Sequence, residues 1–99
     1  GKSAGQQQLQ SMLRLRELAI KQKTSSSNQI KALLLEFNIR VSPRNGGLKG
    51  VVQSTLEDGE NGLSFLFRGA LGAAWKHYLN LLESIRIYDD CLESSISEH

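Results

Sequence analysis

Apolar residues recur every three or four positions in two long stretches of this chain. The first stretch lies within residues 6–38, which contain neither Gly nor Pro. The second begins near residue 63 and continues to about residue 96. This spacing places side chains on one face of an α-helix. The pattern therefore predicts two long amphipathic helices, over about residues 6–38 and 63–96.

A polar segment, KTSSSNQI, interrupts the first stretch at residues 23–30. In a helix, Ser costs only about 0.5 kcal/mol relative to Ala, and a break would be better served by Gly or Pro. We therefore expect one continuous helix. In an antiparallel pair, the small residues around Ser26 and those around Gly72 would lie at similar heights. They predict a close crossing of two helix backbones, within one chain or between two.

Residues 39–61 join the two long helices. Asn38 suits the left-handed conformation that ends many helices, and Gly46 and Gly47 mark a loop. The segment from Leu48 to Asp58 has the apolar spacing of a short helix, weakened by Gly50. The predicted fold is all-α: two long antiparallel helices joined by a loop and a short helix, coiled-coil-like and dimeric.

The chain has 99 residues, of which 39% are hydrophobic, so we expect a single helical module with a lean core. Two or three helices of this size leave apolar stripes exposed, which favours a homodimer. The residues expected at its interface are Ser26, Leu33, Phe37, Leu71, Trp75, Tyr78, Leu82 and Ile85.

The first residue and the single cysteine bear on the origin and the cellular location of the protein. The chain starts at Gly1 rather than Met, so we interpret it as a piece of a longer or processed protein. Cys91 cannot form an internal disulfide, which fits a reducing cytoplasm. No apolar stretch reaches the length of a membrane span, so we expect a cytoplasmic location and no membrane partner.

Charge is unevenly distributed along the chain. Residues 1–50 hold nine Lys or Arg and two acids, whereas residues 51–99 hold three Lys or Arg and eight acids. The basic half could bind phosphate, or it could pair with the acidic half of its own fold or of a partner. Because basic side chains can grip a nucleic-acid backbone without reading bases, the candidate binding residues are Arg14, Arg16, Lys21, Lys23, Lys31, Arg40 and Arg44.

Residues of chemical interest are few and do not combine into a catalytic site. Gly1-Lys2-Ser3 resembles the end of a phosphate-binding loop but lacks the earlier Gly and the preceding strand. His77 and His99 have no metal-ligand spacing. Asp89 and Asp90 point about 100° apart on a helix, and no base is offered to Cys91. We predict no catalytic residue, metal, cofactor or small-molecule substrate.

The string RLRELAIKQKTSSSNQIKALLLEFNI resembles the central helix of the DEDD family of bacterial insertion-sequence transposases, now understood as RNA-guided recombinases. The family pattern there reads R-x-R-x-x-x-x-x-x-R-T-x-x-x-N-Q-[IL]-x-x-L-L-x-E-[FY]-G-I. The later LEDGENGLSFLFR resembles the family's L-[ED]-[DA]-x-x-N-x-L-P-x-x-x-R. This chain departs from the patterns at three positions: Lys23 replaces Arg, Asn38 replaces Gly, and Ser64 replaces Pro.

The resemblance implies a place within a larger protein. Proteins of the family that this chain resembles have three parts: a nuclease domain with four metal-binding acids, a central helical coiled coil, and a domain with a nucleophilic serine. This chain resembles only the central part, so the catalytic residues of a parent transposase would lie outside it. The implied function is non-catalytic: joining protomers and positioning DNA or guide RNA during transposition. The alternative is a stand-alone helical adaptor that binds another protein.

Overall fold

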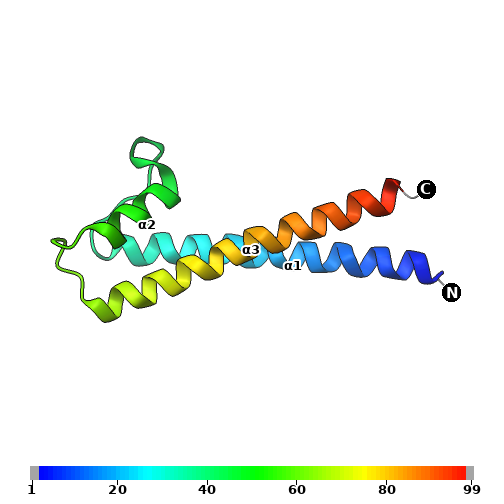
Figure 1. The fold of residues 1–99 in the computed structure, drawn as a ribbon, viewed down its shortest axis with the longest axis horizontal. Coiled ribbons are helices and arrows are strands. Elements are labelled where there is room, and N and C mark those ends of the chain that lie inside the picture. Colours follow the sequence, from blue (N-terminus) through cyan, green and yellow to red (C-terminus); the bar gives the residue numbers. More distant parts are fainter. Residues whose placement is uncertain (1–2, 98–99) are drawn as a thin grey trace. The chain divides into compact units, whose positions relative to one another are not determined.

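The computed structural model describes residues 3–97, and that part of the chain is all-α (Figure 1). Its helices are α1 (Ala4–Leu35), α2 (Gly47–Glu57) and α3 (Phe65–Ser97), with a 3-10 turn, η1 (Pro43–Asn45), before α2. The long helices α1 and α3 are antiparallel, and α1 continues through the serine-rich segment. The predicted all-α class and the single first helix are confirmed, whereas the dimer stays a prediction.

Local hydrogen bonds set the ends of α1. At its start, Ser3 Oγ accepts from the Gln6 N–H over 3.2 Å and Gln6 Oε1 accepts from the Ser3 N–H over 3.3 Å, which is a capping box. At its end, Asn38 adopts a left-handed φ of 61°, and the Ile39 N–H bonds to the Leu34 carbonyl. The helix therefore begins two residues before, and ends three residues before, the predicted bounds.

Two glycines allow the turn before α2 to be compact. Gly46 has a φ of 89°, a backbone conformation that residues with a side chain rarely adopt. A Cβ on Gly50 would lie 2.7 Å from the Asn45 carbonyl oxygen. The Asn45 side chain also closes the turn, because its Nδ2 donates to the Arg40 carbonyl and its Oδ1 accepts from the Ser42 N–H. Gly50 is thus required by close packing, although it lowers the intrinsic stability of α2.

The start of α3 is fixed by Ser64. Its Oγ accepts from the Phe67 N–H over 3.0 Å, in the manner of a helix N-cap. The helix begins at Phe65, two residues after the predicted start.

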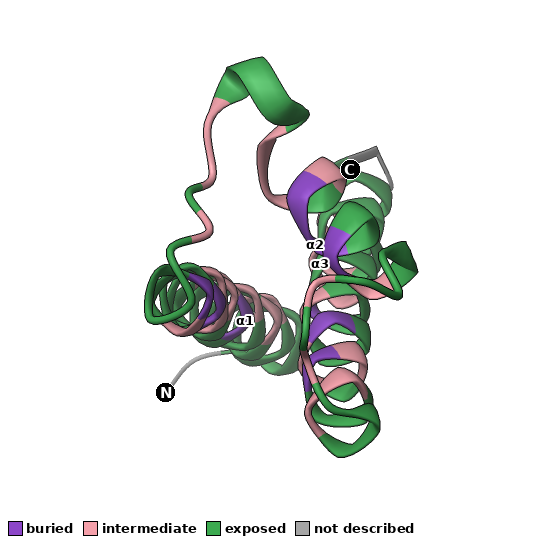
Figure 2. Ribbon diagram, turned by 90° about the vertical axis from the view of Figure 1, so that its left-hand side faces the viewer, coloured by how far each residue is buried: buried purple, intermediate pink, exposed green. Residues whose placement is uncertain are grey.

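Two compact units can be distinguished, and each is described by itself. Unit 2, residues 25–78, contains the main hydrophobic core. Figure 2 shows buried positions as short purple segments on α1, α2 and α3. All three helices contribute to the core of unit 2, which consists of Ile30, Leu34, Val51, Val52, Leu71 and Trp75. In addition, the rings of Phe37 and Phe67 meet edge to face, with centroids 4.8 Å apart.

Unit 1 consists of the first part of α1 and the last part of α3, within residues 3–24 and 79–97. Its buried hydrophobic residues are Ala19 and Leu81. Around them lie half-buried residues at alternating spacings of three and four, the seam of a coiled coil. On α1 the seam includes Met12, Arg16 and Lys23, so that two of its positions hold cations. Unit 1 is therefore a two-helix pair with a sparse and partly charged seam.

The predicted close crossing of Ser26 and Gly72 does not occur within the chain. Cβ atoms on Gly69 or Gly72 would meet no other atom within 4 Å, so these glycines face open space. The residue beside Gly72, Leu71, belongs to the core that contains Ile30 and Leu34, which lie one to two turns beyond Ser26. Similar heights along two antiparallel helices therefore did not ensure that the two small-residue faces point toward each other.

Candidate nucleic-acid interface

The basic residues of α1 lie on two different faces. Residues seven apart on a helix share a face, whereas residues two apart point about 200° apart. Arg14 and Lys21 are exposed on the outer face of unit 1. Arg16 and Lys23 are half-buried on the seam that faces α3. The four predicted residues therefore form two pairs, and only the first pair is fully presented to solvent.

The remaining predicted residues belong to unit 2. Lys31 and Arg40 border one shallow hollow together with Leu35, and Arg44 is exposed on η1. The bend at Asn38 turns the chain back, which brings a cation of α1 close to a cation of the following loop. The structure thus brings together Lys31 and Arg40, nine positions apart in sequence.

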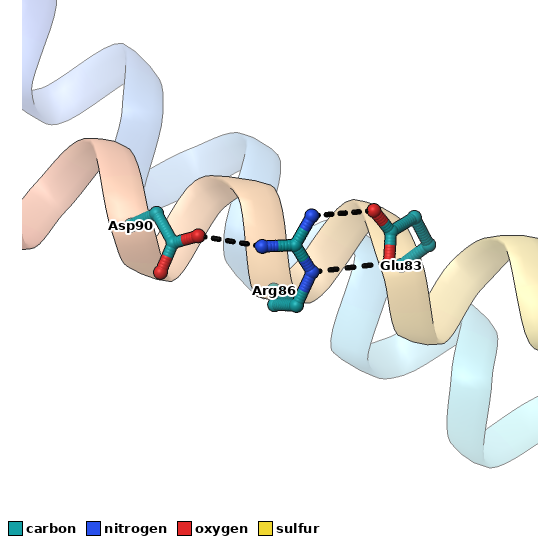
Figure 3. A network of polar contacts seen from close by, with 3 residues as sticks. All are labelled: Glu83, Arg86 and Asp90. Atoms are coloured by element: carbon teal, nitrogen blue, oxygen red, sulfur yellow. Dashed lines mark hydrogen bonds and ion pairs between the residues drawn. The ribbon is translucent and has the colours of Figure 1, made fainter.

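Few of these cations are neutralised by the acidic half of the chain. Among residues 3–97, the ion pairs are Arg16–Asp89 and the two made by Arg86, with Glu83 and Asp90. The Arg86 pairs lie within α3 (Figure 3). The Arg86 guanidinium donates to the Glu83 carboxylate, which lowers the pKa of Glu83. Within residues 3–97, only Arg16–Asp89 joins a cation of the basic half to an acid of the acidic half.

Arg68 is a basic residue with a structural role that the sequence analysis did not assign. Its guanidinium donates to the backbone carbonyls of Thr55, Leu56, Asp58 and Leu63 and to the side chain of Asn61. These bonds close the turn between α2 and α3, so Arg68 is committed to the fold rather than to a ligand. The signal lay in the asparagine and arginine of LEDGENGLSFLFR, seven positions apart.

The predicted interface residues differ in how accessible they are. Leu71 and Trp75 are buried in the core of unit 2, and Tyr78 stacks on Trp75 with ring centroids 5.3 Å apart. A partner chain cannot contact the buried Leu71 in this conformation. Ser26, Leu33 and Ile85 are half-buried, whereas Phe37 and Leu82 are exposed.

Other apolar side chains are better placed to meet a partner. Phe65 and Leu66, at the start of α3 in unit 2, are 88% and 82% exposed. In unit 1 the exposed large apolar residues include Leu13, Leu15, Leu18, Leu79, Leu82 and Ile87. Of these residues, the sequence analysis named only Leu82 as an interface residue, because apolar spacing does not tell which side of each helix is covered.

No group of metal-binding side chains occurs among residues 3–97. Asp89 and Asp90 hold different arginines, and Cys91 is exposed on α3. Ser3 caps α1, while Gly1, Lys2 and His99 lie outside the described residues. In the described part of the chain, no helix combines the length and apolar character needed to cross a membrane.

Comparison with known proteins found no matching family model, no matching curated protein and no matching solved structure.

Proposed function

We infer that this chain is the non-catalytic helical module of a DEDD-type insertion-sequence transposase, where it joins protomers and positions DNA or guide RNA. The carrying observation is the set of exposed basic residues, Arg14, Lys21, Lys31, Arg40 and Arg44, none of which lies within ion-pair distance of a carboxylate among residues 3–97. Such cations bind a phosphate backbone with little dependence on base sequence.

The residues that carry the family resemblance support the same proposal. Asn38 ends α1 in the left-handed conformation that a Gly would adopt, and Asn61 with Arg68 closes the turn before α3. Both motifs therefore serve to build the helical hairpin. In this proposal the parent's catalytic acids and serine lie elsewhere in the parent, the module works in the cytoplasm, and its partners are nucleic acid and a second copy of the chain.

A salt titration of nucleic-acid binding tests the proposal. The whole chain would be titrated against a labelled DNA duplex and a labelled RNA hairpin by fluorescence anisotropy. We expect affinity to fall steeply with salt. The logarithm of the association constant should fall linearly with the logarithm of the salt concentration, with a slope of about −0.9 for each phosphate contact on duplex DNA. The double variants Arg14→Gln/Lys21→Gln and Lys31→Gln/Arg40→Gln should each reduce that slope, while Lys76→Gln, which removes an exposed cation from α3, should change it little.

The competing function is a helical adaptor that binds another protein. The nearly complete exposure of Phe65 and Leu66 favours it, because large apolar side chains displayed on an ordered helix often contact a partner. Light scattering over a concentration series gives the mass of the assembly. Absence of salt-dependent binding to either nucleic acid would favour the adaptor over the transposase module.

A further inference from the structure

The side chains of Arg16 and Asp89 join α1 to α3 in unit 1. Arg16 Nε donates to Asp89 Oδ1 over 2.5 Å, and the two side chains remain 38% and 49% exposed. Arg16 occupies a seam position of α1 that is otherwise suited to an apolar residue. Solvent, and any anion in it, can therefore reach a guanidinium that is already held by a carboxylate.

Asp90, the next residue, makes a different contact. It accepts from Arg86 Nη1 over 2.7 Å, and Arg86 is also held by two bonds to Glu83 (Figure 3). All three residues lie on α3, so loss of Asp90 would leave Arg86 paired on its own helix. Loss of Asp89 would remove the ion-pair partner of Arg16. Two adjacent aspartates thus control cations on different helices.

We propose that Asp89 is an intramolecular competitor for nucleic-acid phosphate: it holds Arg16 in the free protein and is displaced when a phosphate binds there. This rests on the proposed nucleic-acid function. A guanidinium forms charge-assisted bonds with carboxylate and phosphate alike. Partly exposed ion pairs contribute little to stability, so replacing the carboxylate by a phosphate costs little free energy. Lys23, seven positions on along the same face, would form a second contact beside the released Arg16.

The decisive comparison is between Asp89→Asn and Asp90→Asn in the whole chain. Each removes one negative charge from neighbouring exposed positions, so both change the general electrostatic field alike. If Asp89 competes for Arg16, Asp89→Asn should bind a labelled DNA duplex at least about threefold more tightly than Asp90→Asn at low salt. Its salt slope should be steeper by about 0.9, the increment for one added phosphate contact. Adding Arg16→Gln to Asp89→Asn should abolish both gains.

Each alternative result has a definite meaning. Equal gains for the two asparagine variants would show that only net charge matters, and the competition would be rejected while the proposed function stood. A gain that persists in Arg16→Gln/Asp89→Asn would reject Arg16 as the released cation. If neither the unmodified chain nor any variant binds DNA at low salt, both the proposed function and this proposal are rejected. Circular dichroism would confirm that each variant remains helical.

Discussion

The Arg68 guanidinium donates a hydrogen bond to Asn61 Oδ1 over 2.5 Å in the turn between α2 and α3. The same amide side chain donates from Nδ2 to the Thr55 carbonyl, at 2.9 Å, and its Oδ1 accepts from the Leu63 N–H. Asn61 therefore links the end of α2 to the start of α3, and Arg68 reinforces that link from the first turns of α3.

Replacing Arg68 should destabilise unit 2 without removing any of its apolar core. Arg68→Lys keeps the charge, but a single ammonium cannot reproduce the forked contacts to several carbonyls. Because hydrogen bonds to charged groups each contribute about 1.5–3 kcal/mol, the free energy of unfolding should fall by roughly 2 kcal/mol or more, measured by urea denaturation. Lys76→Met, on the same helix, should change it by less than about 0.5 kcal/mol. Equal effects would contradict the assigned role.

Adjacent leucines at the end of α1 offer a matched test of the core. Leu34 is 0% exposed and Leu35 is 53% exposed. Leu34→Ala should cost about 2–5 kcal/mol because it leaves a cavity among packed side chains, whereas Leu35→Ala should cost far less. Chemical denaturation of both variants checks the difference, and a similar cost for the two would mean that this part of α1 packs differently.

Replacing Gly50 and Gly72 by alanine should change the stability of the protein in opposite directions. Gly50→Ala places a Cβ against the Asn45 carbonyl and should destabilise the protein by roughly 1–3 kcal/mol. Gly72→Ala enters open space within a helix, where alanine is preferred by up to about 1 kcal/mol. Thermal melting should therefore show a lower Tm for the first variant and a higher Tm for the second. A lower Tm for Gly72→Ala, in a sample of unchanged mass, would revive the predicted close crossing.

Acid should weaken the contacts around Arg86. The pKa of Glu83 is lowered from its ordinary value of 4.5, chiefly because Arg86 donates a hydrogen bond to its carboxylate. The stabilisation is therefore complete above the ordinary pKa and is lost as pH falls through the lowered pKa of the folded state. An NMR titration should place the midpoint of Glu83 below 4.5 and move it upward in Arg86→Gln. An unchanged midpoint in that variant would disprove the pairing in solution.

The sequence predicted the helices well because their signals are local. Apolar spacing, the absence of Gly and Pro in residues 6–38, and the tolerance of Asn38 for a left-handed turn all act within a few residues. The partner of Arg16 was not predictable in the same way. It depends on the register of α1 against α3, which joins residues 73 positions apart and which no local pattern encodes.

The candidate site was less predictable than the fold because it depends on faces and partners. Basic composition identified the cations of α1, but alternate faces separate Arg14 from Arg16, and Asp89 pairs with only the latter. Arg68 was overlooked because its acceptors are backbone carbonyls, which a sequence does not display. The exposure of Phe65 and Leu66 likewise could not be predicted from their hydrophobicity.

The chain carries a single tryptophan and a single cysteine, and they lie in different units. Trp75 is buried in the core of unit 2, so its emission would report the unfolding of that unit. Cys91 is exposed in unit 1 and would accept a maleimide dye there without mutagenesis. Recording both signals during one denaturant titration would show whether the sparse pairing of α1 with α3 in unit 1 dissolves before the three-helix core. The protein thus contains its own two-colour assay of cooperativity.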